Sequence, residues 1–409
     1  MSIFRVSVWA LIVIAVDFIV GIINQKIYAT FVGNEGLVLI GNFNNVMNIL
    51  LLLGSGGILS GITKVVAQKG SQSIWKHIFT LLVATALITS IVATIFFPFI
   101  KQTVVPTGVE VHPLALEGLL IALPLMVIYT GYMHLLMGLK KVKTYSLFRV
   151  GQQIVNLIST FILTVTLLFN GVVLSSYVPS ILMFLVLMIA FKNVVVKPEF
   201  SDFSQAKTLY KELAQFSIAT FISTILLYSS QLFIRNYVSV HLSVEEASYW
   251  QVLVTLSRMW LAFFSFIVVT YLFPQVASIQ DIRTARRKAF RLISLLILGA
   301  SLAGLILYVL RNALIILIYN NDFLEAANYF HLQIIADIIK IAGLSFAYYS
   351  LAKGWIRLYI LSEIIYYGLW IFLGSMLLSS LGLKGIFYAQ IVAMSAYTFL
   401  LGIYFTRGK

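Results

Sequence analysis

Three side chains capable of binding or acid–base chemistry stand out in a segment that is otherwise almost wholly apolar. The stretch QIIADIIKIAG (333–343) places Gln333, Asp337 and Lys340 within an apolar run from about 326 to 352. At 100° per residue, the three lie within an arc of roughly 60° on one helix face. A charge at the centre of a bilayer costs at least about 2.5–3.5 kcal/mol, so such residues mostly line a cavity or a pathway. The spacing predicts a charged face inside a membrane-spanning helix.

A second apolar segment repeats this pattern, and other segments carry polar faces of their own. In QVLVTLSR, Gln251, Thr255 and Arg258 show the same spacing of four and then three residues. The candidates for the polar lining of a cavity are Asn24, Asn44, Asn45, Asn48, Gln152, Asn156, Thr224, Gln231, Gln251 and Gln333. Polar faces on five or six segments are more than one helix bundle needs for packing. We therefore expect a water-filled cavity.

The charged residues of these segments indicate an anionic ligand that is rich in hydroxyl groups. The cations are Lys26, Arg235, Arg258 and Lys340, and the acids are Asp17, Asp337 and Glu363. Arginine and lysine are good partners for phosphate, and amides suit the hydroxyls of a sugar chain. Moving such a chain through lipid would cost about 2–7 kcal/mol per unsatisfied polar group. We expect the cations to bind substrate and the acids to form ion pairs or to couple transport to an ion.

Purely structural interpretations of the same residues stay open. Asp337 and Lys340 have the order and spacing of a pair that neutralises itself along one helical turn. Asp17 and Arg258 are both expected near mid-depth, where a pair between them would fix the register of the two halves. Asparagine and serine in membrane spans often join helices through hydrogen bonds worth about 0.6 kcal/mol each.

The composition predicts a membrane protein. Hydrophobic residues make up 61% of the 409, charged residues make up 10%, and the mean hydropathy is +1.00. A soluble domain needs far more charge to cover its surface, whereas a bilayer core takes roughly 20 apolar residues per helix. The predicted fold class is an all-α polytopic membrane protein with twelve transmembrane helices. They are expected at 6–31, 37–66, 74–100, 113–139, 145–169, 172–191, 208–240, 246–278, 288–310, 326–352, 357–379 and 383–405.

The basic residues predict the orientation of these helices. Most of the 28 lysines and arginines, Arg149 among them, fall in one alternate set of loops that includes both termini. Short loops rich in these residues stay in the cytoplasm, so both termini should be cytoplasmic. The net charge of +14 is then a topology signal, and no nucleic-acid partner is predicted. The long polar stretch 192–212 divides the chain into two predicted six-helix lobes, 1–195 and 196–409, around a central cavity.

Motifs for enzymatic chemistry are missing from the sequence. It has no cysteine, hence no thiol nucleophile and no cysteine metal site. It contains no Gly-rich phosphate loop and no HExxH, and its five histidines are never paired at i and i+4. No predicted loop exceeds about 20 residues, which leaves no room for a soluble catalytic domain. We predict a transporter without cofactor or metal, driven by an ion gradient, with proton antiport ranked before sodium coupling and before uncoupled downhill transport.

Several segments resemble bacterial lipid-linked oligosaccharide flippases. These segments are GNFNNVMNILLLLGSGGILSGITKVVAQ (41–68), YWQVLVTLSRMW leading to YLFPQVAS (249–278), and DIIKIAGLSFAYYSLAKGWIRLYILSEIIYY (337–367). The flippases are the O-antigen and enterobacterial-common-antigen (lipid III) translocases of the multidrug/oligosaccharidyl-lipid/polysaccharide exporter superfamily. The resemblance extends along the whole chain. It implies two six-helix lobes around a cavity that opens alternately to cytoplasm and periplasm.

The resemblance also implies a cargo and a location. The cargo would be an undecaprenyl-diphosphate oligosaccharide, with its diphosphate on the cavity cations and its prenyl tail among the membrane lipids. An Asp17–Arg258 pair would couple cargo to closure if the phosphate took the arginine. The location would be the bacterial inner membrane, and the protein partners would be a polysaccharide polymerase and a chain-length regulator.

Three other classes share parts of this pattern. A multidrug exporter of the same superfamily would need an acid-dominated cavity, whereas the residues here are mostly cationic. A membrane polysaccharide polymerase usually presents a large periplasmic loop, and the predicted outer loops are short. Peptidoglycan-precursor flippases are typically longer, with extra spans. The sequence therefore favours the oligosaccharide flippase.

Overall fold

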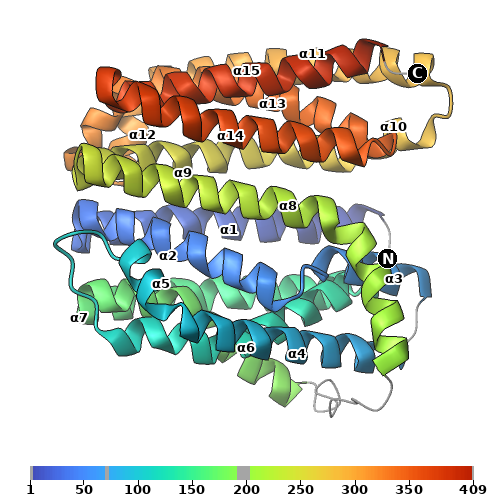
Figure 1. Ribbon diagram of the computed structural model, residues 1–409, viewed down its shortest axis with the longest axis horizontal. Coiled ribbons are helices and arrows are strands. Elements are labelled where there is room, and N and C mark those ends of the chain that lie inside the picture. Colours follow the sequence, from blue (N-terminus) through green and yellow to red (C-terminus); the bar gives the residue numbers. More distant parts are fainter. Residues whose placement is uncertain (1–2, 70–72, 191–202, 408–409) are drawn as a thin grey trace. The chain divides into compact units, whose positions relative to one another are not determined.

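In the computed structural model of the protein, residues 3–69, 73–190 and 203–407 are described, and these residues are almost entirely helical and form no β-strand. The chain forms two compact units, Met1–Ser229 and Ser230–Lys409 (Figure 1). The predicted boundary between lobes, at residues 195 and 196, lies outside the described residues and stays a prediction. The all-α prediction is confirmed.

The first unit contains seven helices and the start of an eighth. They are α1 (Ile3–Phe31), α2 (Gly33–Gly54), α3 (Leu59–Lys69), α4 (Ser73–Ile95), α5 (Phe97–Val104), α6 (Pro113–Gly138), α7 (Val142–Ala190) and the first part of α8 (Phe203–His241). Two predicted spans are wrong as single helices. The span 37–66 breaks between α2 and α3, where Gly56 and Gly57 have φ of +59° and +65°. The span 74–100 breaks at Phe96, after which Pro98 occupies the first turn of α5.

The helix α7 is a folded-back pair of spans. At 1.5 Å per residue, its 49 residues would reach about 74 Å, more than twice the hydrocarbon thickness of a bilayer. Leu168 interrupts it with non-helical backbone angles, φ 48° and ψ −122°. Gly171 then lies so close to the carbonyl of Leu163 that a Cβ atom would overlap it. The predicted spans 145–169 and 172–191 are the two arms of this turn.

The second unit contains the rest of α8 and the helices that follow it. They are α9 (Val244–Ile267), a π-helical segment (Val268–Leu272), α10 (Phe273–Ser278), α11 (Ile282–Val309), α12 (Arg311–Ile318), a 3₁₀ segment (Asn321–Tyr329), α13 (Phe330–Ala352), α14 (Ile356–Leu381) and α15 (Leu383–Arg407). Gln333, Asp337 and Lys340 lie on α13, as the sequence predicted. Gln251, Thr255 and Arg258 lie on α9.

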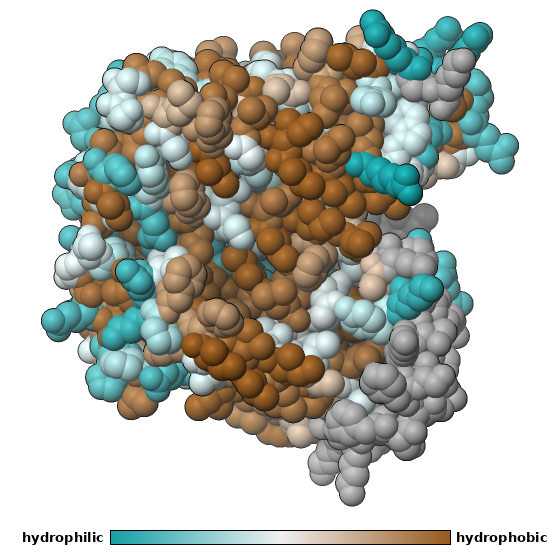
Figure 2. Space-filling model, in the orientation of Figure 1, coloured by the Kyte–Doolittle hydropathy of each residue, from teal (hydrophilic) through white to brown (hydrophobic). Residues whose placement is uncertain are grey.

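The surface of these helices suits a lipid environment. Eleven helices in the described part of the chain are long and apolar enough to cross a membrane, and α7 counts once among them although it makes two passes. Ile88, Ile121 and Phe399 expose 61%, 80% and 71% of their area, which would be costly in water but not in lipid. Figure 2 shows hydrophobic residues over large parts of the visible face. The protein is a multi-pass membrane protein.

Candidate functional site

Arg235 of α8 is held inside the second unit by the polar stripe of α9. Its guanidinium is fully buried, and Nε donates a hydrogen bond of 3.0 Å to Oε1 of Gln251. The amide of Gln251 in turn donates to Oγ1 of Thr255 at 3.1 Å. The ring of Trp250 lies 5.3 Å from the guanidinium carbon, a favourable cation–π distance. Gln251 and Thr255, which were predicted to share a polar face of α9, thus orient Arg235 of the neighbouring helix α8.

Arg258 and Lys340 complete a group of three cations in this unit. Arg258 lies near enough to Arg235 and to Lys340 for its charge to act on each of them. Arg258 is exposed and Lys340 is half-buried. Among the described residues, no carboxylate forms an ion pair with either of them. We call Arg235, Arg258 and Lys340 the cation cluster.

Asp337 is satisfied by neutral donors rather than by a cation. The side chain is completely buried in α13. Its Oδ1 accepts hydrogen bonds from the Ser257 hydroxyl at 2.7 Å and from the Gln333 amide at 2.8 Å. Its Oδ2 accepts from Nε1 of Trp260 at 2.8 Å. Lys340 interacts with Asp337 electrostatically, but in the described part of the chain the two form no ion pair. Lys340 is therefore not neutralised by direct contact with Asp337.

The third predicted acid, Glu363, lies among tyrosines on α14. Its side chain is 9% exposed, and its Oε1 accepts a hydrogen bond of 2.9 Å from the hydroxyl of Tyr397 on α15. It interacts electrostatically with Lys340. The second unit therefore contains three of the four predicted cations and two of the three predicted acids.

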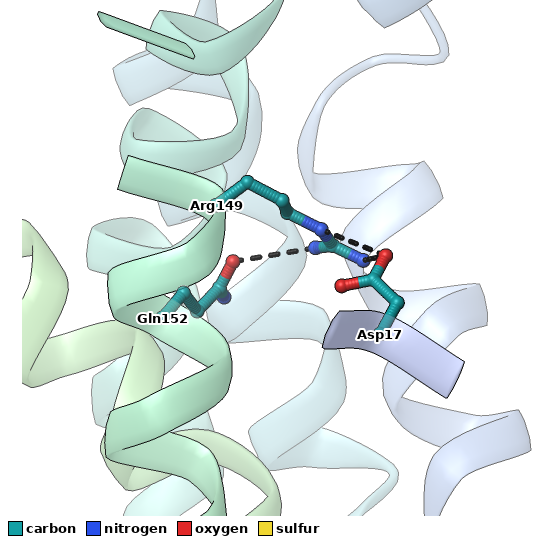
Figure 3. Close-up of polar contacts among 3 residues, drawn as sticks. All are labelled: Asp17, Arg149 and Gln152. Carbon is teal, nitrogen blue, oxygen red and sulfur yellow. Dashed lines mark hydrogen bonds and ion pairs between the residues drawn. The ribbon is translucent and has the colours of Figure 1, made fainter. Parts of the chain in front are cut away.

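The remaining acid, Asp17, forms an ion pair within the first unit. Its Oδ2 accepts from Nη2 and Nε of Arg149 at 3.1 and 3.4 Å. Nη1 of the same arginine donates to Oε1 of Gln152 at 3.3 Å (Figure 3). The carboxylate of α1 is thus held by an arginine of α7, while the predicted Asp17–Arg258 pair would join the two units and stays a prediction. The prediction that Arg149 is a loop residue is wrong, since it lies seven residues inside that helix.

A cavity of about 270 Å³ adjoins this ion pair within the first unit. Its lining comes from α2, α6 and both arms of α7, and consists of Met47, Leu51, Met126, Thr130, Arg149, Gln152, Gln153, Asn156, Ser176, Pro179 and Ser180. The Gln152 amide donates to the Ser180 hydroxyl at 3.3 Å across the two arms of α7. Asn24 of α1 donates to Oδ1 of Asn156 at 2.5 Å. Three predicted polar residues, Asn24, Gln152 and Asn156, thus lie at or beside one cavity.

The predicted asparagines of α2 do not line this cavity. Asn48 donates to the backbone carbonyl of Asn44, four residues earlier, at 2.7 Å. Asn45 is 2% exposed. The cavity contacts α2 at Met47 and Leu51 instead. The asparagines thus share a polar face of α2, as predicted, but the face of α2 that lines the cavity is the neighbouring one with Met47 and Leu51.

Three further candidates lie away from this cavity lining. Lys26 of α1 and Thr224 of α8 are both half-buried and belong to the first unit. Gln231 is 8% exposed and precedes Arg235 by four residues, so the two lie on one face of α8. Within the ranges that the structure describes, no three His, Asp or Glu side chains come together as a metal site.

The chain is similar to known transporters in sequence and in fold. No family model matches it. It is 22% identical over 404 residues to a protein of Escherichia coli (strain K12) named Lipid III flippase. The alignment covers 97% of this chain and 96% of that relative. A multidrug resistance MATE family transporter of the MOP superfamily, in an inward-facing conformation, superposes with a TM-score of 0.80 at 12% identity, over 95% of this chain and 94% of that one. The lipid II flippase MurJ, in an inward closed conformation, superposes with a TM-score of 0.74 at 15% identity. The superposition covers 98% of this chain and 87% of MurJ.

The fold is similar to those of a MATE family transporter and of MurJ. Both solved structures match nearly the whole chain, so the likeness includes both units rather than one repeated element. The resemblance to lipid-linked oligosaccharide flippases, stated above from three sequence segments, is confirmed by the full-length relative.

Proposed function

We propose that this protein is a transporter, not an enzyme, that flips an undecaprenyl-diphosphate-linked oligosaccharide from the cytoplasmic to the periplasmic leaflet. The proposal is supported by a relative named Lipid III flippase that matches 97% of the chain, and by a fold shared with transporters. The transport cycle is alternating access coupled to an ion gradient. The cargo serves O-antigen or common-antigen assembly, with a polymerase and a chain-length regulator as partners.

The observation that carries the proposal is the cation cluster. Arg235, Arg258 and Lys340 come from three different helices of one unit, α8, α9 and α13, and the charge of Arg258 acts on each of the other two. Like charges repel one another across a medium of low dielectric constant, and an anion bound near them lowers that cost. Arginine and lysine are the side chains that bind phosphate best. The diphosphate of a lipid-linked sugar is therefore a suitable ligand for the cluster.

The location we propose is the bacterial inner membrane, with both termini in the cytoplasm. The first turns of α11 carry Arg283, Arg286, Arg287, Lys288 and Arg291. A basic group beside a membrane span stays on the cytoplasmic side. The even number of passes then brings both ends of the chain to that side.

The test is translocation of a labelled undecaprenyl-diphosphate oligosaccharide in proteoliposomes. We expect Arg258→Ala and Lys340→Ala each to slow flipping about tenfold or more, because a charged hydrogen bond contributes about 1.5–3 kcal/mol. Lys384→Ala, which removes an exposed lysine at the start of α15, is the matched control and should flip like wild type. Equal flipping by all four proteins would show that the cluster does not bind the cargo.

A multidrug exporter is the second candidate, favoured by the TM-score of 0.80 with a MATE transporter. Such a protein would carry a lipophilic cation, which three clustered cations repel. Ethidium efflux from the same proteoliposomes separates the two functions. Ethidium transport without any flipping would replace the proposal, whereas flipping without ethidium transport supports it.

A further inference from the structure

The cavity of the first unit is lined mainly by uncharged polar side chains, whereas the cation cluster consists of charged ones. Seven of its lining side chains are polar, and of these only Arg149 carries a charge. That charge is balanced by Asp17, which forms an ion pair with it at 3.1 Å. The site is therefore close to neutral, and a diphosphate would gain little net attraction there. Amides and hydroxyls are the groups that remain to bind a ligand.

Arg149 still has donors to offer from within its ion pair. A guanidinium carries five N–H donors in a planar fork. Three of them are engaged, by Asp17 through Nε and Nη2 and by Gln152 through Nη1. One N–H on each Nη atom has no partner among the described residues, and the side chain is 36% exposed. These two donors can thus bind the oxygens of a neutral ligand while the carboxylate keeps the charge balanced.

Two other side chains of the lining form no hydrogen bond within the part of the chain that the structure describes. Gln153 on α7 and Thr130 on α6 both line the cavity, and neither makes a hydrogen bond to the described residues. Both are half-buried, so their polar atoms remain accessible. Each side chain therefore keeps its hydrogen-bonding groups available to water or to a ligand. Together with the free N–H groups of Arg149, Gln153 and Thr130 form a site that can hydrogen-bond a ligand with several hydroxyl groups.

The size and the apolar part of the lining favour one sugar ring. The volume of about 270 Å³ lies just below the range of roughly 300–1,000 Å³ in which drug-sized ligands bind. The cavity has room for a single ring but not for an oligosaccharide. Met47, Leu51 and Met126 supply an apolar wall. A sugar ring has C–H faces that pack on such a wall and hydroxyls around its edge that reach the amides.

We propose that this cavity is a saccharide subsite, which holds one neutral, hydroxylated ring of the cargo through Arg149, Gln153 and Thr130. The proposal rests on the proposed function, because it divides the cargo between two places. The diphosphate binds the cation cluster of the second unit, and a sugar binds the first unit. Asp17 acts as a positioning residue that orients Arg149 and cancels its charge.

The test measures two water-soluble probes on the full-length protein in nanodiscs. The first is the saccharide released by mild acid from the polyprenyl-diphosphate-linked pool of the cell that makes the protein. The second is inorganic pyrophosphate. Gln153→Leu and Thr130→Val remove hydrogen-bonding groups without removing any hydrogen bond to the described residues. Each should raise the dissociation constant for the saccharide about tenfold, leaving that for pyrophosphate and the melting temperature unchanged.

The matched control is Thr166→Val, which makes the same exchange at an exposed position of α7 outside the cavity and should bind both probes like wild type. Unchanged saccharide binding in Gln153→Leu and Thr130→Val would overturn the subsite. Wild-type protein that binds pyrophosphate but no saccharide would also overturn it, and would leave the proposed function standing. Wild-type protein that binds neither probe would overturn both. Saccharide binding that the variants lose, without pyrophosphate binding, would keep the subsite and remove the diphosphate site.

Discussion

The two units hold their membrane-embedded acids in different ways, and this difference divides the chemistry between them. In the first unit, Asp17 takes two hydrogen bonds from Arg149, and both side chains are about one-third exposed. In the second unit, Asp337 is completely buried and accepts from neutral groups. One acid forms an ion pair with a cation, and the other forms none with the cations of its unit in the described part of the chain. The charge of each site therefore depends on whether its acid pairs with a cation, as Asp17 does, or accepts hydrogen bonds from neutral groups, as Asp337 does.

Replacing each acid by alanine should show this difference in stability. Asp337→Ala leaves the donors of Ser257, Trp260 and Gln333 without their acceptor, and a buried unsatisfied donor costs about 1–3 kcal/mol. We expect a loss of at least about 3 kcal/mol, seen as a large drop in melting temperature and yield. Asp17→Ala breaks a partly exposed pair worth about 0–1 kcal/mol, so its melting temperature should barely change. Equal losses in the two variants would contradict the comparison.

The cationic character of the second unit can be removed without touching its acid. Arg258→Gln and Lys340→Gln should each weaken pyrophosphate binding about ten- to a hundredfold, because each loses a charged hydrogen bond of about 1.5–3 kcal/mol. Saccharide binding should not change. Isothermal titration of nanodisc-embedded protein measures both, with Lys384→Gln as a control at an exposed lysine. A loss of saccharide binding in these variants would place both parts of the cargo in one unit.

The first unit should become cationic when its acid is neutralised. Asp17→Asn keeps an oxygen that can accept from Arg149 but removes the balancing charge. In a protein that also carries Lys340→Gln, this change should restore part of the pyrophosphate binding, by up to about tenfold. Asp17→Glu keeps the charge and should restore nothing. If neither exchange has an effect, the charge balance of the cavity does not select its ligand.

The sequence predicted the helices and their polar faces well, because both depend on local spacing. Apolar runs of about 20 residues locate the spans, and the helical repeat places residues four apart side by side. The hydrogen bonds from Gln251 to Thr255 and from Gln333 to Asp337 follow directly from that spacing. The breaks in two predicted spans were missed, although the glycines at 56 and 57 and the proline at 98 mark them in the sequence.

The partners of the acids could not be predicted, because they come from other helices. Periodicity tells which residues share a face but not which helix lies opposite. Arg149 is 132 positions from Asp17, and it follows Lys140, Lys141 and Lys143, so it looked like one more loop charge. Ser257 and Trp260 carry no signal that distinguishes them from other residues of α9. Two amides of this cavity, Gln152 and Asn156, were predicted and its arginine was missed, while the predicted central cavity between the lobes stays a prediction.

Asp281 lies outside the membrane-spanning segments, and we expect its replacement to change the melting temperature only slightly. It serves as a reference for Asp17 and Asp337. Asp281 precedes α11, and the hydrogen bond from the Thr284 hydroxyl, then those from the backbone N–H groups of Thr284 and Arg283, lower its pKa below the usual value. A lowered pKa means that the stabilisation is complete above the unfolded pKa of about 3.9 and is lost as pH falls through the folded value. Asp281→Ala should therefore lower the melting temperature slightly at neutral pH, and the difference from wild type should shrink in acid. A difference that stays constant would mean that the ionised carboxylate does not stabilise the start of the helix.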